Sequence, residues 1–319
     1  MFLTLLLSSF LTFVELNCEN IFDTAHDSLK NDYEYLPESK YQWTPTRYWH
    51  KLDQISQELI ALGDTYCDKK QRSGQVPDLV ALCEIENDTV MRDLTKRSLL
   101  RNAGYEYVMT SSPDERGIDV ALMYQPVSFR LLNTHSIRIK QLPNTRPTRD
   151  ILYASGILTS DDTLHVFVVH APSRRGGEVA SRPYRLQVAS QLGAAVDSLY
   201  ALNKQAKILI AGDFNDYHDS PALDSLYRHS LTNISAKVEG TNGAKGTYRY
   251  HGEWNSLDQI LCSPSLLKKK KMCQVGDLSF LLVEDEKYGG KMPFRTYQGP
   301  KYLGGYSDHL PLVARFKMK

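Results

Sequence analysis

The stretch Lys207-Ile208-Leu209-Ile210-Ala211-Gly212-Asp213-Phe214-Asn215-Asp216 decides the fold and the chemistry of this chain. An apolar run of strand character ends in two polar residues, Asp213 and Asn215. Further along, Tyr306-Ser307-Asp308-His309-Leu310-Pro311 places its polar residues just before the apolar run 312–316. A carboxylate beside an amide or imidazole at the end of a buried strand suits metal-assisted hydrolysis of phosphate esters.

Four more apolar runs have a polar residue where the strand is expected to end or begin. These residues are Asn17 after 11–16, Glu84 after 79–83, His170 after 165–169 and Asp258 near the start of 257–262. If the strand ends gather at one rim of the fold, they form an acidic cup that contains histidine. A lone Asp or Asn in Gly-Asp-Phe-Asn-Asp is typical of a turn, so the hypothesis depends on the whole set.

Carboxylate and amide oxygens with few sulfurs suit Mg²⁺, with Mn²⁺ as a substitute. A zinc site needs more His or Cys at closer spacing, such as HExxH, and the sequence has no such motif. The five cysteines show no CxxC spacing, and Cys18, Cys83 and Cys262 lie in or beside apolar runs. We therefore expect buried, unpaired cysteines.

The composition is sufficient for a large apolar core and does not exclude an enzyme. The chain has 319 residues, 42% hydrophobic content, and a net charge of +1 from 38 basic and 37 acidic residues. A nonspecific duplex-binding protein would usually be more basic. Short linkers favour one domain over residues 1–319, and nothing in the pattern requires a stable protein partner, so we expect a monomer.

The N-terminus has two interpretations. Residues 1–13 (MFLTLLLSSFLTF) are apolar like the core of a signal peptide, but they have no preceding Lys or Arg and no clear cleavage site. They also lead directly into the expected strand that ends before Asn17. Residues 1–10 are therefore a candidate partial signal segment, and cytoplasmic and exported locations both stay open. No other segment approaches the ~18 to 20 apolar residues that span a membrane.

Apolar runs rich in Val, Ile, Leu and Tyr recur along the chain and predict strands. They are residues 11–16, 78–83, 105–110, 118–124, 127–139, 151–158, 164–169, 208–211, 257–262 and 312–316. Apolar residues at three- and four-residue steps predict three helices. These are 48–62 with Gly63 as the stop, 90–100 with an end at Gly104, and 184–202. Together they predict an α/β fold with two sheets face to face and helices outside.

Seven segments, in order along residues 17–311, resemble the endonuclease/exonuclease/phosphatase superfamily, including its uncharacterised bacterial members. This superfamily contains DNase I, exonuclease III-type enzymes, neutral sphingomyelinases and inositol polyphosphate 5-phosphatases. The segments are NCENIFD (17–23), ALCEIEN (81–87), RGIDVAL (116–122), HAPSRRGG (170–177), GDFND (212–216), SLDQI (256–260) and SDH (307–309). The resemblance implies a DNase I-like, four-layer α/β/β/α sandwich.

The resemblance also implies the metal ligands. Glu84 matches the principal Mg²⁺-binding glutamate, Asn17 matches an asparagine that supports the metal and the phosphate, and Asp308 resembles a second carboxylate near the metal. The glutamine that often precedes this glutamate is Cys83 here, and the asparagine that often precedes the family's histidine is Val169. Because cysteine cannot make the amide's hydrogen bonds, the support of Glu84 is the weakest part of the match.

The catalytic roles follow from the same resemblance. Asp213 resembles the aspartate that orients or deprotonates the attacking water, and Asn215 is its phosphate-binding neighbour. His170 matches a histidine that contacts the phosphate or assists the leaving group. His309 matches the histidine that hydrogen-bonds the scissile phosphate, with Asp258 as the carboxylate that holds it. Such a carboxylate would fix the tautomer of the imidazole and favour its protonated form.

Other polar residues have weaker interpretations. Arg116 and Arg174 are candidates for substrate binding, although ion pairs or solvated loop charges explain them almost equally well. Glu19 and Glu86 are expected at the surface or at a helix start. Tyr248 and Trp254 could stack on a base or sugar, with core packing as the default. The lysine run 268–271 predicts a solvated hairpin tip.

The function that these observations predict is an Mg²⁺-dependent phosphodiesterase that acts on nucleic acid. A phospholipid, sphingomyelin or inositol polyphosphate hydrolase is the close enzymatic alternative, and it would favour a hydrophobic membrane-docking hairpin, of which the sequence shows no clear example. A noncatalytic binding module with the same fold is the alternative outside enzymes. It predicts the loss of at least one of Glu84, Asp213, Asp308 and His309, and all four are present.

Overall fold

The structure is a computed structural model and describes residues 10–67, 75–143 and 145–318. Two six-stranded sheets form its centre. In spatial order the first consists of β13 (Lys270–Val275), β18 (Leu312–Lys317), β1 (Phe10–Ile21), β2 (Leu79–Ile85), β4 (Asp119–Tyr124) and β3 (Glu106–Met109). The second consists of β5 (Phe129–Ile137), β6 (Ile151–Leu158), β7 (Thr163–His170), β8 (Lys207–Asp213), β12 (Asp258–Cys262) and β9 (Thr232–Asn233).

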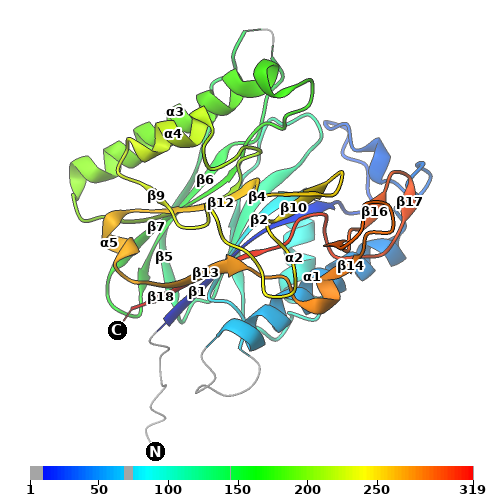
Figure 1. Ribbon diagram of the computed structural model, residues 1–319, viewed down its shortest axis with the longest axis horizontal. Helices are drawn as coiled ribbons and strands as arrows, with labels where there is room; N and C mark the ends of the chain where they lie inside the picture. Colours follow the sequence, from blue (N-terminus) through cyan, green and yellow to red (C-terminus); the bar gives the residue numbers. More distant parts are fainter. Residues whose placement is uncertain (1–9, 68–74, 144, 319) are drawn as a thin grey trace, which may run out of the picture.

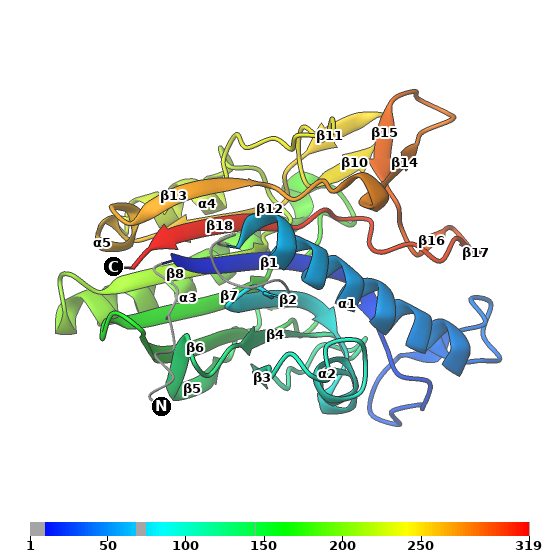
Figure 2. The ribbon, with the colours of Figure 1, turned by 90° about the horizontal axis from the view of Figure 1, so that it is seen from below.

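Helices cover the outer face of each sheet (Figures 1 and 2). On the first sheet lie α1 (Pro45–Tyr66) and α2 (Asp88–Lys96), and on the second lie α3 (Glu178–Leu202) and α4 (Pro221–Tyr227). The remaining elements are η1 (Tyr33–Tyr35), α5 (Pro264–Leu267), η2 (Ser279–Leu281) and the hairpins β10 (Tyr248–Tyr250) with β11 (Glu253–Asn255), β14 (Leu282–Glu284) with β15 (Lys291–Pro293), and β16 (Tyr297–Gln298) with β17 (Lys301–Tyr302). The predicted four-layer α/β/β/α sandwich is confirmed.

Three apolar cores separate the four layers, and strand alternation explains them. In β1, Leu11 and Phe13 face the second sheet, whereas Val14 and Leu16 pack under α1 and α2. A central strand with both faces buried reads as a continuous apolar run, as the sequence of β1 does. Within the described residues no helix is both long and apolar enough to cross a membrane. Of the candidate signal segment, residues 1–9 lie outside the described residues, and Phe10 begins β1.

The predicted helix boundaries need correction. The second helix ends at Lys96 rather than near Gly104, and the Ser98 N–H bonds the Asp93 carbonyl just beyond that end. The third begins at Glu178, six residues before the predicted Tyr184, and contains Pro183. Its first turns are held by Arg185, whose guanidinium contacts Ser181 Oγ at 2.8 Å and buried Asp216 at 2.9 Å. These side-chain contacts are not visible in the local apolar pattern.

Gly63 was predicted to stop the first helix, but α1 continues through it to Tyr66. A Cβ atom at residue 63 would lie 2.0 Å from the carbonyl oxygen of Gln75. The position therefore needs glycine for close approach of the backbone and not for a left-handed turn.

We expect Gly63→Ala to lower the free energy of unfolding by about 2 kcal/mol, because the steric overlap outweighs the ~1 kcal/mol that alanine gains inside a helix. Urea denaturation would measure the change, with Asp64→Ala at the next, exposed position as the control. A Gly63→Ala protein more stable than the wild type would refute this explanation.

Candidate active site

The pairing of the strands places the polar strand ends at one rim. In the second sheet, His170 of β7 is the register partner of Asp213 of β8, and Asp213 is in turn the partner of Asp258 of β12. Lateral partners in a sheet point to the same face, so these three side chains form one row. In the first sheet, β1 and β2 run parallel and bring Asn17 beside Cys83, next to Glu84.

Asp213 joins the two sheets at this rim. Its Oδ2 accepts hydrogen bonds from Asn17 Nδ2 at 3.1 Å and from Asn215 Nδ2 at 3.2 Å, and its Oδ1 accepts one from the Asn215 N–H at 2.7 Å. Burial, with the nearby charge of Asp258, raises the pKa of Asp213 to about 7. A carboxylate with this pKa is poised to accept a proton near neutral pH.

The backbone conformation around Asp213 explains why the sequence here is Gly-Asp-Phe-Asn. Gly212 has a φ of 143°, and a Cβ there would lie 1.8 Å from the Val169 carbonyl oxygen. Asn215 has a left-handed φ of 50°, which asparagine tolerates better than most residues. Its side chain also donates to the Ala171 carbonyl at 3.0 Å, which ties the two loops together. These residues make a turn, as a local interpretation predicts, and the same turn aims Asp213 at Asn17.

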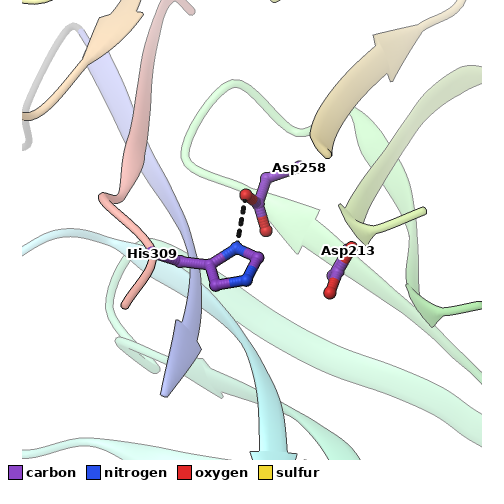
Figure 3. A group of neighbouring side chains, drawn as sticks. All are labelled: Asp213, Asp258 and His309. Atoms are coloured by element: carbon purple, nitrogen blue, oxygen red, sulfur yellow. Dashed lines mark hydrogen bonds and ion pairs between the residues drawn. The ribbon is translucent and has the colours of Figure 1, made fainter. Parts of the chain in front are cut away.

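Asp258 and His309 form a buried pair (Figure 3). His309 Nδ1 lies 2.8 Å from Asp258 Oδ2, which also accepts a 2.5 Å hydrogen bond from Thr247 Oγ1. Burial alone would lower the pKa of His309, but the carboxylates led by Asp258 raise it well above its ordinary value. The imidazole is therefore a cation held next to Asp213.

Two further contacts fix the loop that carries His309. Ser307 Oγ donates to the Asn17 carbonyl at 2.6 Å and accepts from the His309 N–H at 3.1 Å. The Tyr248 ring packs on the imidazole with centroids 4.9 Å apart. This places Tyr248 at the site, whereas the partly buried Trp254 packs against the core beside Arg249.

His170 lies between two carboxylates. Its Nε2 is 3.8 Å from Glu84 Oε1 and 3.7 Å from Asp213 Oδ2, which is beyond hydrogen-bond range. Burial lowers the pKa of His170 well below its ordinary value, and the cations Arg149 and Arg116 lower it further. His170 is therefore neutral where His309 is charged, and the two histidines have different chemistry.

Glu84 sits at a β-bulge with a left-handed φ of 65°, and its Oε2 accepts a hydrogen bond from the Asn20 N–H at 2.9 Å. This backbone N–H donates a hydrogen bond to Glu84, as the side-chain amide of a preceding glutamine would. The two departures from the family pattern also touch each other, because Cys83 Sγ lies 3.3 Å from the Val169 carbonyl. The Cys83 thiol donates a hydrogen bond to this carbonyl, and the bond links β2 of the first sheet to β7 of the second.

The oxygens around Glu84 fit a hard divalent cation. Among the described residues, Glu84 Oε1 accepts no hydrogen bond and faces the neutral His170. Asn17, the register partner of Cys83, offers an amide oxygen on β1, although its Oδ1 accepts from the Glu19 N–H at 3.0 Å. Carboxylate and amide oxygens of this kind are the donors that Mg²⁺ and Mn²⁺ prefer.

A second group of donors is formed by Asp213 and Asp258 of this row together with His309, and their ligand atoms are all within 4.8 Å of one another. His309 Nδ1 faces Asp258, so a metal there would bind the neutral imidazole through Nε2 and could keep the hydrogen bond to Asp258. The oxygens around Glu84 and this second group are two places whose donor atoms could hold a divalent cation.

Asp308 and Glu19 share one arginine. Asp308 Oδ2 accepts from Arg295 at 2.9 Å, and Arg295 lies 3.6 Å from Glu19 Oε1. Asp308 therefore lies in an ion pair at the edge of the predicted site. The prediction of a surface Glu19 is wrong, because its side chain is 9% exposed, accepts from the Thr296 N–H at 2.6 Å, and has its pKa raised to about 7 by burial.

Glu86 lies at a helix start, one of its two expected positions, because it directly precedes Asn87, the N-cap of α2; it is buried and not at the surface. It accepts from the Asp23 N–H at 2.7 Å, and burial raises its pKa to about 8. Arg174 donates a hydrogen bond to Asp216 at 3.2 Å and stacks on Tyr217. The Arg116 side chain is 49% exposed, and its nearest ion-pair distance among the described residues is 3.8 Å, to Asp114.

The lysine run 268–271 does not form a hairpin tip. It ends α5 and begins the edge strand β13, where lysines discourage pairing with another chain.

Sequence reasoning missed several residues at the site. Arg149 is buried between Asp114 and the Ala171 carbonyl, and no local pattern marks it. Glu15 is fully buried on the inter-sheet face between Phe13 and Asn17, and burial and the charges of Asp258 and Asp213 raise its pKa. A charged residue inside the apolar run 11–16 is the signal that could have found it.

The family of this chain follows from comparison with known proteins. The model of the Endonuclease/Exonuclease/phosphatase family matches residues 12–318, so the chain belongs to this family, whose members hydrolyse phosphate esters. No curated protein matches the sequence.

Several solved structures have the same fold. A mannosyl-6-phosphatase from Bacteroides thetaiotaomicron has a TM-score of 0.63 at 16% identity, with 95% of this chain and 98% of that chain covered. TDP2 from D. rerio, complexed with a single-strand DNA product, has a TM-score of 0.55 at 14% identity, with coverage of 97% and 99%. The human nocturnin catalytic domain with bound sulfate has a TM-score of 0.54 at 17% identity, with coverage of 97% and 95%. At these identities the likeness shows the fold alone.

Proposed function

We propose that this protein is an Mg²⁺-dependent phosphodiesterase that hydrolyses nucleic acid by in-line attack of water. The observation that carries the proposal is the row of His170, Asp213 and Asp258, with cationic His309 bonded to Asp258 and Asn17 bonded to Asp213. It combines a base, a positive charge and a neutral imidazole at one buried rim. A phosphodiester needs all three types of group, because it is an anion attacked by a weak nucleophile.

Each residue has a separate role in the proposed reaction. Asp213 accepts the proton of the attacking water, and the amides of Asn17 and Asn215 hold its carboxylate in place. His309, kept protonated by Asp258, neutralises charge that develops on the phosphate oxygens. Neutral His170 donates a hydrogen bond to the phosphate or the leaving oxygen. When bound at Glu84, with Asn17 and Asp308 nearby, a divalent cation would supply Lewis-acid neutralisation of the same charge.

A phosphomonoesterase that acts on a sugar phosphate is the second candidate, because one structural neighbour is a mannosyl-6-phosphatase. A substrate panel separates the two. Purified protein would be incubated, with Mg²⁺ and with EDTA, with plasmid DNA, RNA, bis-p-nitrophenyl phosphate, p-nitrophenyl phosphate, mannose 6-phosphate, sphingomyelin and an inositol polyphosphate. EDTA-sensitive cleavage of DNA or RNA supports the proposal, and exclusive cleavage of sphingomyelin or of the monoesters refutes it.

Replacement of the metal-binding carboxylate tests the cofactor. We expect Glu84→Gln to lower kcat/KM about 100-fold at 1 mM Mg²⁺ and to raise the Mg²⁺ concentration for half-maximal activity about tenfold, because the charged oxygen is lost without a change of shape. Glu86→Gln is the control, since that carboxyl lies two residues away and bonds the Asp23 N–H instead of facing His170. An unchanged Mg²⁺ dependence in Glu84→Gln would place the metal elsewhere.

A further inference from the structure

A cavity of about 430 Å³ lies beside the loop that follows His170, the first residue of the row formed with Asp213 and Asp258. It is bounded by the loop before Asp150, by residues 114–116 and by the segment that follows His170 and enters α3. Pro172 and Ser173 line it, and Arg149 at its floor donates to the Ala171 carbonyl at 2.8 Å. The cavity therefore shares a wall with the loop that positions His170.

The charge of this cavity is strongly positive. Arg116, Lys140, Arg146, Arg149 and Arg175 line it, against only Asp114 and Glu115. Asp114 is paired with Arg149 at 3.1 Å, and Glu115 lies 3.5 Å from Arg146. Among the described residues, the side chains of Lys140 and Arg175 make no ion pair or hydrogen bond. Two unneutralised cations thus face one space next to the site.

Two residues of the lining, Thr148 and Arg149, belong to the wall of the cavity. Arg149 is 6% exposed, and its terminal nitrogens bond Asp114 and the Ala171 carbonyl. The groups that a ligand would meet are therefore the exposed cations. Leu142 and Tyr184 add apolar surface to the same lining. A ligand that fits has both an anionic group and an apolar ring.

We infer that this cavity binds the nucleotide next to the scissile phosphate, with Lys140 and Arg175 on the neighbouring phosphate and Leu142 and Tyr184 against the sugar and base. This inference rests on the proposed function and makes it more specific. A sugar monophosphate has no second phosphate for the two cations, and the choline cation of sphingomyelin would be repelled by them. The preferred substrate is a strand that has a further phosphate beside the bond that is cut.

Short substrates with one scissile bond test the inference. Thymidylyl-thymidine has one phosphodiester and no other phosphate, and it is compared with the same dinucleotide bearing a 5′ or a 3′ terminal phosphate. For the wild type we expect one terminal phosphate to raise kcat/KM by about 10- to 100-fold at low salt, through charge-assisted hydrogen bonds. In Lys140→Gln/Arg175→Gln this advantage should fall to about twofold or less. Product chromatography distinguishes cleavage of the diester from loss of the terminal phosphate.

The matched control is Lys204→Gln/Arg228→Gln, which removes the same charge beyond the C-terminal ends of α3 and α4 and should keep the full advantage. Hydrolysis of bis-p-nitrophenyl phosphate, which lacks a second phosphate, shows whether each variant retains its catalytic machinery. Equal rates with and without the terminal phosphate in the wild type would overturn the inference, as would an equal loss in both double variants.

Binding keeps the inference testable if the wild type cleaves none of these compounds. Calorimetry on Asp213→Asn, with and without the Lys140→Gln/Arg175→Gln changes, would measure Kd for the dinucleotide and its phosphorylated forms. Tighter binding of one phosphorylated form that depends on Lys140 and Arg175 supports the subsite even if hydrolysis fails. Equal Kd values would refute the subsite while leaving the proposed hydrolysis intact.

Discussion

Asp213→Asn is expected to lower kcat/KM for phosphodiester hydrolysis by about 10³- to 10⁴-fold, because an amide cannot accept the proton of the attacking water. Asparagine keeps the shape of the side chain, and its one oxygen can accept from the Asn17 and Asn215 side chains, although the bond from the Asn215 N–H is then lost. The fold should therefore persist, which thermal denaturation would verify. Steady-state kinetics with bis-p-nitrophenyl phosphate and with a dinucleotide would measure the loss.

The pH profile gives this prediction a second readout. The active form of Asp213 is the carboxylate, and its pKa is about 7. Wild-type activity should therefore fall as the pH falls through about 7, and the residual activity of Asp213→Asn should lack this acid limb. Asp219→Asn, an exposed change in the following loop, is the control. If Asp213→Asn retained a tenth of wild-type activity, another group would have to be the base.

Asp258→Asn is expected to have the second largest effect, a loss of about 10³-fold in kcat/KM, because it removes the charge that keeps His309 protonated and oriented. The Asp258 carboxylate is the leading cause of the raised pKa of His309, and it also raises the pKa of Asp213. Both limbs of the pH profile should therefore move to lower pH in this variant: the alkaline limb through His309 and the acid limb through Asp213.

Thr247→Val is the matched control for this network. It deletes the hydroxyl that donates to Asp258 Oδ2 but leaves the carboxylate and its hydrogen bond to His309. We expect a loss below about tenfold, with the alkaline limb near its wild-type position. An Asp258→Asn protein that lost activity without any movement of the alkaline limb would show that His309 does not act as a cation.

The sandwich was largely predictable from the sequence, because most of its central strands are local apolar runs and each lies within a few residues of its predicted position. Helix ends were less predictable, since Gly63 lies inside α1 only because Gln75 packs against it. Glu19 and Glu86 show the same limit, because both look like surface glutamates and are buried by segments distant in the sequence that donate backbone N–H groups.

The candidate site was also only partly predictable from the sequence. Asp213, Asp258, His170 and His309 could be proposed from the sequence as a set, since each interrupts or borders an apolar run and the family's motifs occur in order. Their partners could not, because the register that places Asp213 between His170 and Asp258 depends on how β8 pairs with β7 and β12. Arg149 and the cavity that it lines could not be predicted either, because three separate segments of the chain enclose that cavity.

The sequence by itself determined the strands, the polar residues at their ends and the order of the family's motifs, because short-range patterns of apolar and polar residues govern backbone conformation and burial. The tertiary structure alone decided that His170 is neutral while His309 is charged, and that Asp213 is poised near neutral pH. A pKa depends on desolvation and on charges a few ångströms away, and the fold brings those charges together from positions as far apart in the chain as Asp213 and His309.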